Sequence, residues 1–479
     1  MSTVPSLNSN ADRGDAARSS RTLAGPRALP FLGNAPEFVR GGVPHRQLER
    51  WADEHGPTYR LRLGPRNVVV TADPAHVDLI LRRRPHDFRR ARSTSSIVDE
   101  LVRPGAFTAE GDHWRRLRKV ATQSLSPSYL RQYFDTVTMV TGRLLRRWEA
   151  FAASGERIDV LDQTTRYTLD VAVGLAMGHD LNSLENSGDG LHTRLPALLA
   201  AFSQRLMTPI PYWRLVKLPR DRRLDATVRE VEALVRGRYE GAKARVEAGE
   251  QPSNFLEALV RPLDDVPEIT ESEVLGNVFT MLLAGSDTTS SAAGWALHFL
   301  AEHPEIHEKV RAEADEVLGE RELPADPAAM GRLQYAEAVV NEALRLRPPI
   351  PFLGFEPTRN LSITGSDGRE LSLAADEEVF LLLSYGGRRD AERFPAPGVF
   401  SPERWLEGKP ADGKLPFVPF GAGPRFCPGR NLALIETSMV TSVLARTFDF
   451  TPDRSAGAVV EGLSFAMIPK NLYLRVSPR

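Results

Sequence analysis

Apolar residues recur at three- and four-residue spacing through most of the chain, which is the pattern of amphipathic helices. The pattern is almost continuous over residues 74–262, where only proline and glycine positions interrupt it. A longer helix is predicted from Thr270, because Glu273 completes a capping box with it and no stop signal follows before Pro304. At about 1.5 Å per residue it spans on the order of 50 Å. Its apolar middle, residues 278–284, predicts burial.

Alternating apolar and polar residues, typical of strands, occur near both ends of the chain. Residues 58–63 and 67–71 alternate on either side of a Gly64-Pro65 turn and predict a hairpin. Beyond the helix that Pro348-Pro349 stops, short strands are predicted at residues 361–364, 370–373, 379–383 and 472–476. Helices dominate, so the predicted fold is mainly α with a minor β subdomain.

Composition excludes several classes of protein. The 479 residues are 42% hydrophobic and 26% charged with a formal net charge of -1, which gives no support to nucleic-acid binding. The single cysteine excludes an intrachain disulfide and fits a reducing compartment, so a cytoplasmic protein is expected. No apolar run is long enough for a membrane span, and no signal-peptide core is found, so neither is expected.

The N-terminal residues 1–22 are polar, and we predict a disordered tail there, followed by one domain over residues 23–479. A transit peptide is the weaker alternative, because Asp12 and Asp15 do not suit a signal that is poor in acidic residues.

Cys427 lies in a glycine- and proline-rich loop, residues 420–429, directly before a helical pattern that begins at Arg430. Unpaired amide groups and the positive dipole at a helix N-terminus favour a thiolate, so Cys427 is a candidate axial ligand for iron. The alternative is a small buried hydrophobic residue, which is the usual role of a lone cysteine.

In the middle of the long predicted helix, residues 284–289 (Ala-Gly-Ser-Asp-Thr-Thr) are poor helix formers and predict a kink. Such an opening leaves room for a small ligand, with Thr288 as a hydroxyl donor and Asp287 as a proton source behind it. The alternative is that the hydroxyl groups bond only to the preceding helical turn.

Three further groups of charged residues are candidates for specific roles. Glu342 and Arg345 share one helix face, and with Arg404 they form a candidate scaffolding cluster whose alternative is a surface ion pair. Trp114 and Arg118 also share a face, and together with Arg425 they offer three donors for the acidic groups of a cofactor, although each alone is more often a surface residue. The arginines at positions 82–84, 89 and 90 suit an anion, but a solvated helix end is the preferred interpretation.

These motifs, in this order, resemble the cytochrome P450 family of haem-thiolate monooxygenases, in its soluble, bacterial-type form, from about Gly25 to the end of the chain. The resemblance implies a single large P450-like fold, with haem b between the long central helix and the helix after the cysteine loop. It makes Cys427 the iron ligand and places these residues around the haem: Trp114, Arg118, Ala284, Gly285, Phe420, Gly421, Arg425 and Gly429. It also implies the scaffolding cluster of Glu342, Arg345 and Arg404, and a substrate pocket that includes Met281, Phe352, Leu353 and Phe465.

One departure from the family pattern concerns the haem carboxylates. The family usually carries an arginine about nine residues before a glycine here, and counting back from Gly365 gives Glu356. Either Arg359 substitutes for it, or one haem carboxylate is held differently.

The resemblance also implies the reaction. One oxygen atom of O2 would enter a hydrophobic substrate of the terpenoid, steroid, fatty acid or polyketide class, by hydroxylation or epoxidation, with Asp287 and Thr288 delivering protons. Electrons from NAD(P)H would arrive through a separate ferredoxin and ferredoxin reductase, because no reductase domain follows Arg479, and a monomer is expected. The alternatives are a peroxide-driven peroxygenase and a non-catalytic haem-binding sensor or carrier.

Overall fold

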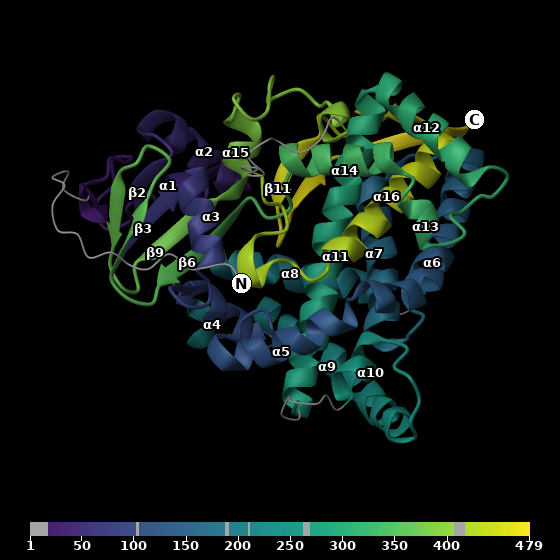
Figure 1. Cartoon of the computed structure of the whole chain (residues 1–479), viewed down its shortest axis with the longest axis horizontal. Coiled ribbons are helices and arrows are strands. Elements are labelled where there is room, and N and C mark those ends of the chain that lie inside the picture. Colours follow the sequence, from purple (N-terminus) through teal and green to yellow (C-terminus); the bar gives the residue numbers. More distant parts are fainter. Residues whose placement is uncertain (1–17, 102–104, 187–190, 209–210, 262–268, 407–416) are drawn as a thin grey trace, which may run out of the picture.

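The computed structural model describes residues 18–101, 105–186, 191–208, 211–261, 269–406 and 417–479 (Figure 1). Its helices are α1 (Ala35–Phe38), α2 (Pro44–His55), α3 (Pro74–Arg82), α4 (Arg92–Leu101), α5 (Gly111–Ser124), α6 (Pro127–Ser154), α7 (Val160–Met177), α8 (Leu191–Met207), α9 (Pro219–Glu247), α10 (Phe255–Val260), α11 (Glu271–Glu302), α12 (Pro304–Leu318), α13 (Pro327–Met330), α14 (Gln334–Leu346), α15 (Leu383–Arg389) and α16 (Arg430–Thr447). Its strands are β1 (Arg18–Ser19), β2 (Thr58–Leu63), β3 (Arg66–Thr71), β4 (Phe88–Arg90), β5 (Ile158–Asp159), β6 (Phe352–Pro357), β7 (Leu361–Thr364), β8 (Glu370–Leu373), β9 (Glu378–Leu382), β10 (Phe448–Pro452), β11 (Val460–Leu463), β12 (Met467–Lys470) and β13 (Tyr473–Pro478).

Helix α11 runs through the centre of the helical part, where α7, α14 and α16 pack against it (Figure 1). It begins as the sequence predicts, because Thr270 and Glu273 form the reciprocal hydrogen bonds of a capping box. Its middle is buried, with Val278, Phe279 and Leu282 fully enclosed. The mainly α fold predicted from the sequence is therefore confirmed.

The predicted kink at residues 284–289 is not found, since α11 is helical without a break from Glu271 to Glu302. Hydroxyl side chains hydrogen-bond to the helix itself there, and this alternative is the one that the structure supports. Packing of the buried face of α11 against its neighbours outweighs the weak helical propensity of a few residues.

A five-stranded sheet in the order β2-β3-β9-β6-β4 joins the N-terminal hairpin to residues 352–382. The predicted hairpin is confirmed, with Thr58 opposite Thr71, and so are the strands predicted at residues 361–364 and 370–373. Strand β6, which the sequence analysis did not predict, carries Phe352 and Leu353. The sheet therefore brings residues 58–90 and 352–382, which lie on either side of α11 in the sequence, to one side of this helix (Figure 1).

Of the tail predicted over residues 1–22, residues 1–17 lie outside the described part of the chain. Residues Arg18 and Ser19 form β1, which pairs with β8 in parallel orientation. Strand β1, which lies within the predicted tail, is thus the edge strand of a separate three-stranded sheet in the order β1-β8-β7.

Candidate active site

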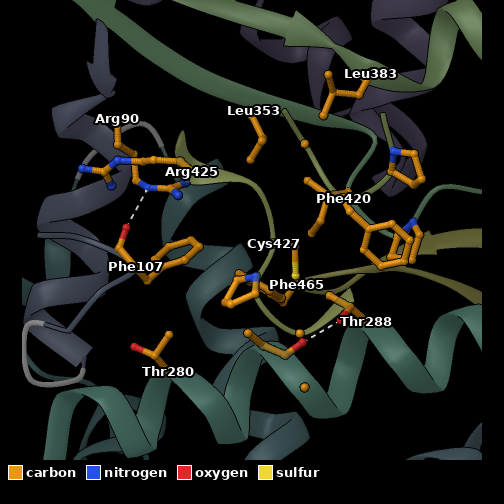
Figure 2. Close-up of a pocket in the computed structure, with 18 of the residues that line it drawn as sticks. Arg90, Phe107, Thr280, Thr288, Leu353, Leu383, Phe420, Arg425, Cys427 and Phe465 are labelled. Atoms are coloured by element: carbon orange, nitrogen blue, oxygen red, sulfur yellow. Dashed lines mark hydrogen bonds between the residues drawn. The ribbon is translucent and has the colours of Figure 1, made fainter. Parts of the chain in front are cut away.

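A cavity of about 430 Å³ lies between α11 and the cysteine loop. Figure 2 shows Cys427 and Thr288 on its walls, with Phe465 beside them. Every residue that the sequence analysis assigned to the cofactor or the substrate pocket lines it, namely Trp114, Arg118, Met281, Ala284, Gly285, Phe352, Leu353, Phe420, Gly421, Arg425, Cys427, Gly429 and Phe465. Residues from distant parts of the sequence therefore converge on one enclosed space.

The cysteine loop is a tight turn that packs against α3. The amide of Cys427 donates to the Phe420 carbonyl oxygen at 2.8 Å and closes the loop. Gly423 has φ +70°, and a Cβ atom built there would lie 2.6 Å from the Arg82 Cα atom, so only glycine suits this position. The glycine and proline pattern therefore reflects both the turn and its close approach to α3.

Burial raises the pKa of the Cys427 thiol, although the amides of Gly429 and Arg430 and the nearby charge of Arg118 lower it. The sequence analysis expected the helix N-terminus to favour a thiolate here, and the amide contacts are present. In the protein alone, however, loss of water contact outweighs them. A metal ion bound to the sulfur would reverse this balance, because a coordinated thiol loses its proton.

On the opposite wall, the Thr288 hydroxyl donates to the Ala284 carbonyl oxygen at 2.6 Å. Asp287 lies behind this wall, where one carboxylate oxygen accepts a hydrogen bond from the Ala466 amide at 2.7 Å. Burial raises the pKa of Asp287 to about 6, and the hydrogen bond from Ala466 only partly opposes it. Asp287 therefore changes its charge close to neutral pH.

Three residues that were predicted to donate hydrogen bonds to the acidic groups of a cofactor lie together at one end of the cavity. They are Trp114, Arg118 and Arg425. The Arg425 guanidinium lies 4.4 Å from the centre of the Trp114 ring and donates to the Ala109 carbonyl oxygen at 2.7 Å. It also pairs with Glu110. Arg118 donates to the Phe426 carbonyl oxygen in the cysteine loop.

Two further arginines line the same end, and the sequence analysis preferred a solvated position for both. That interpretation is wrong for Arg84 and Arg90, whose side chains are buried. Arg84 lies 4.4 Å from the centre of the Phe355 ring, and its Nε and Nη2 atoms have no hydrogen-bond partner. Arg90 lies over Phe107 and donates to its carbonyl oxygen, as Figure 2 shows.

Glu356 occupies the position where the family usually has an arginine. Glu356 faces away from the cavity and pairs with Arg89, while Arg359 is exposed and pairs with Asp87 at 2.9 Å. Arg359 therefore does not substitute for the expected arginine, and of the two alternatives the second remains. Arg84, which follows α3 and lies over Phe355, does line the cavity.

Arg84, Arg90 and Arg425 surround a single carboxylate, that of Glu110, which is 3.7 Å from Arg84. Burial and, to a smaller extent, the neighbouring charge of Arg425 lower the pKa of Arg90 to about 10, although Glu110 partly opposes them. Buried cations without enough counter-charge are costly, so this end of the cavity requires an anion.

Glu342 and Arg345 are fully buried outside the cavity. Arg345 contacts both carboxylate oxygens of Glu342, at 2.7 and 2.8 Å, and Arg404 contacts one of them at 3.0 Å. Further Arg345 donors meet the carbonyl oxygens of Pro397 and Val399. The cluster joins α14 to the segment that leads to the cysteine loop, as predicted for a scaffolding role.

A sequence model of one family, described as cytochrome P450, matches residues 23–476. The chain belongs to the cytochrome P450 family. Curated P450 relatives include a putative cytochrome P450 CYP13A3 of Caenorhabditis elegans, 26% identical over 95% of this chain and 94% of its own length. The probable cytochrome P450 4e1 of Drosophila melanogaster is 27% identical over 91% and 83%. The human 25-hydroxyvitamin D-1 alpha hydroxylase, named as mitochondrial, is 29% identical over 95% and 92%.

Membership makes the protein an oxidoreductase of the monooxygenase type. These relatives are animal proteins, so they do not support the bacterial-type form expected from the sequence. Among the described residues, no helix combines the length and apolarity that a membrane span requires.

The residues of this P450 suit haem. Cys427 would ligate the iron, and the two haem carboxylates match a cavity end with an excess of cations and with unpaired donors on Arg84 and Arg425. Small residues leave the space between the two walls open, namely the glycines of the cysteine loop on one wall and Ala284 and Gly285 on the other.

Proposed function

We propose that this P450 inserts one oxygen atom from O2 into a hydrophobic substrate. The observation that carries the proposal is the placement of Cys427 and Thr288 on walls of one cavity, with the acid Asp287 next to Thr288 in sequence and buried behind that wall. When bound, haem supplies oxygen activation, and thiolate ligation favours cleavage of the O–O bond.

The protein's own contribution is to hold protons close to the oxygen site. The Thr288 hydrogen is directed at the Ala284 carbonyl, so its oxygen is left to accept a hydrogen bond from water in the cavity. With a pKa near 6, Asp287 takes up and releases protons at neutral pH, as a proton donor must.

The substrate side of the cavity is apolar. Met281, Leu353 and Phe465 line it, and Phe465 packs against Phe202 and Phe107. Such a lining favours a terpenoid, steroid, fatty acid or polyketide, which excludes water from the reacting centre. A screen of these four classes, read as displacement of iron-bound water in the absorbance spectrum, would select among them.

Electrons are proposed to come from NAD(P)H through a separate ferredoxin and its reductase. Arg115 and Lys119 are exposed on α5, the helix whose Arg118 contacts the cysteine loop, and an acidic ferredoxin would be attracted to them. The human relative is named as mitochondrial, which favours a mitochondrial location over the cytoplasmic location expected from the sequence. Charge reversal of Lys119 should slow electron transfer without changing the bound haem.

Two experiments test this function. The reduced carbon monoxide complex should show the strongly red-shifted Soret band of thiolate ligation, and Cys427→Ser should remove it. An intact band in that variant would refute the assignment of the ligand.

The second experiment separates the monooxygenase from a peroxygenase and from a sensor. Turnover with NAD(P)H and redox partners should exceed turnover with peroxide, and Thr288→Ala should consume electrons without forming product. The matched control is Thr280→Ala, because Thr280 lines the same cavity from the same helix and makes the same type of hydrogen bond, to the Gly276 carbonyl at 2.8 Å. If both variants stay equally coupled, Thr288 has no role in proton delivery.

A further inference from the structure

Strands β11 and β12 form a hairpin whose tip enters the substrate cavity. Leu463, Ser464 and Phe465 of the tip line the cavity. The Phe465 ring centre lies 5.5 Å from that of Phe202 in α8 and 6.3 Å from that of Phe107. The hairpin therefore supplies one member of an aromatic group that lines the apolar side of the cavity, and Figure 2 shows two of its members, Phe107 and Phe465.

At the other end of β11, the Glu461 carboxylate gathers donors from three separate elements. Arg46 of α2 contacts both oxygens, at 2.5 and 2.6 Å, and His45 contacts one at 2.9 Å. Arg347, which follows α14, lies 3.0 Å away, and Arg388 of α15 lies 3.1 Å away. One side chain thus connects the hairpin to the sheet-containing part and to the helical part of the molecule (Figure 1).

The same contacts reach the opposite strand of the hairpin. The Arg347 guanidinium lies 5.1 Å from the centre of the Trp295 ring in α11, and the Trp295 indole donates to the Met467 carbonyl oxygen at 3.1 Å. Both strands of the hairpin are therefore held against α11 by groups that meet at Glu461.

The Glu461 side chain is 7% exposed. None of the residues that it contacts lines the end of the cavity where the cofactor would bind. Burial alone would raise its pKa, but the hydrogen bond from His45 and the charges of Arg388, Arg46 and Arg347 hold the pKa far below its usual range. The carboxylate stays ionised and balances three arginines that otherwise share only Glu49. Neutralising it would remove the ion pair of Arg347, leave Arg46 and Arg388 with Glu49 alone, and release the hairpin.

We propose that Glu461 is a positioning residue for substrate selection: it fixes the hairpin so that Phe465 meets Phe202 and Phe107, and so it sets the shape of the substrate cavity. The inference rests on the proposed function, because it concerns the same cavity. It also predicts that Glu461 affects large ligands and leaves small ones unaffected.

The test uses the haem-loaded protein, its Glu461→Gln variant and two iron-binding azoles. Imidazole needs only the iron, whereas clotrimazole also fills the apolar side of the cavity. For Glu461→Gln we expect an unchanged Kd for imidazole and a Kd for clotrimazole raised about tenfold, read from the shift of the Soret band. The matched control is Lys470→Gln, an exposed charge on the same hairpin, which should change neither value.

A double-mutant cycle with Phe465→Ala separates positioning from general stability. If Glu461 acts through Phe465, then Glu461→Gln should have no further effect on clotrimazole in the Phe465→Ala background. A full effect in that background, or equal Kd values for clotrimazole in wild type and Glu461→Gln, overturns the inference. Wild-type protein whose Soret band does not respond to imidazole would instead refute the proposed function. If Glu461→Gln does not fold, Arg46→Gln, which removes the partly exposed partner, should raise the Kd for clotrimazole in the same way.

Discussion

Replacing Arg84 with methionine should have opposite effects on the haem-free and the haem-loaded protein. The Arg84 side chain is buried, and its Nε and Nη2 atoms make no hydrogen bond in the protein alone, although Nη2 lies 3.7 Å from the Glu110 carboxylate. Each unpaired buried donor costs about 1–3 kcal/mol. Methionine keeps the apolar stem, and its sulfur replaces part of the contact of about 1–2 kcal/mol between the guanidinium and the Phe355 ring. We therefore expect the haem-free variant to be more stable than wild type by about 1–2 kcal/mol.

With haem present the same donors would face its carboxylates. A hydrogen bond to a charged group contributes about 1.5–3 kcal/mol, so losing even one of them should weaken haem binding by about 10- to 100-fold. Urea unfolding of the haem-free protein measures the first effect, and the rate of haem transfer to a haem-acceptor protein measures the second.

The matched control is Arg359→Met, because Arg359 is exposed and only pairs with Asp87. This control should change the free energy of unfolding by less than about 0.5 kcal/mol. It should also leave the rate of haem transfer close to that of wild type. A haem-free Arg84→Met protein that is less stable than wild type, together with unchanged haem transfer, would show that Arg84 stabilises the fold and binds no carboxylate.

Three other predictions concern buried groups. Glu342→Gln leaves the buried Arg345 and the partly buried Arg404 without this carboxylate and should lower the free energy of unfolding by about 3–5 kcal/mol in urea, whereas Glu320→Gln, an exposed carboxylate, should change it little. Because the pKa of Asp287 is raised from 3.8 to about 6, its contribution to stability is present at low pH and is lost as the pH rises through 6. Unfolding of wild type measured against Asp287→Asn should show a loss of about 2 kcal/mol between pH 4 and pH 7, and parallel curves would contradict the raised pKa. Gly423→Ala places a Cβ atom 2.6 Å from the Arg82 backbone at φ +70° and should lower the midpoint of thermal unfolding and speed haem loss, whereas alanine at Gly237, which meets nothing within 4 Å, should not speed haem loss.

Local signals predicted the regular elements well and the surroundings of single side chains poorly. The capping box at Thr270 and the turn at Gly64-Pro65 are short-range features, so the helix and the hairpin that they begin or join could be predicted. Arg82 and Arg84 are two residues apart in one arginine run, yet Arg82 is exposed and Arg84 buried. What separates them is the packing of β6, which brings Phe355 under Arg84. No periodicity within the run contains that information.

The β11–β12 hairpin escaped prediction for a similar reason. Its strands have four residues each and include Gly462 and Pro469, which both weaken a strand signal. Its stability comes from distant groups, since Asp287 accepts from the Ala466 amide and Trp295 donates to Met467. The sequence identified Asp287 as an acid near Thr288, but its contact with the hairpin depends on tertiary structure alone.

Two buried arginines, Arg345 and Arg84, show how a scaffolding cluster differs from a ligand site. Every nitrogen of the Arg345 guanidinium donates to Glu342 or to a main-chain carbonyl oxygen. Arg84, equally removed from water, keeps two nitrogens without a partner and shares Glu110 with other arginines. Both residues are buried cations near a carboxylate, so charge alone does not distinguish them. The donors do: those of Arg345 are all used inside the protein, whereas the unsatisfied donors of Arg84 lie on the cavity wall, where a ligand can reach them.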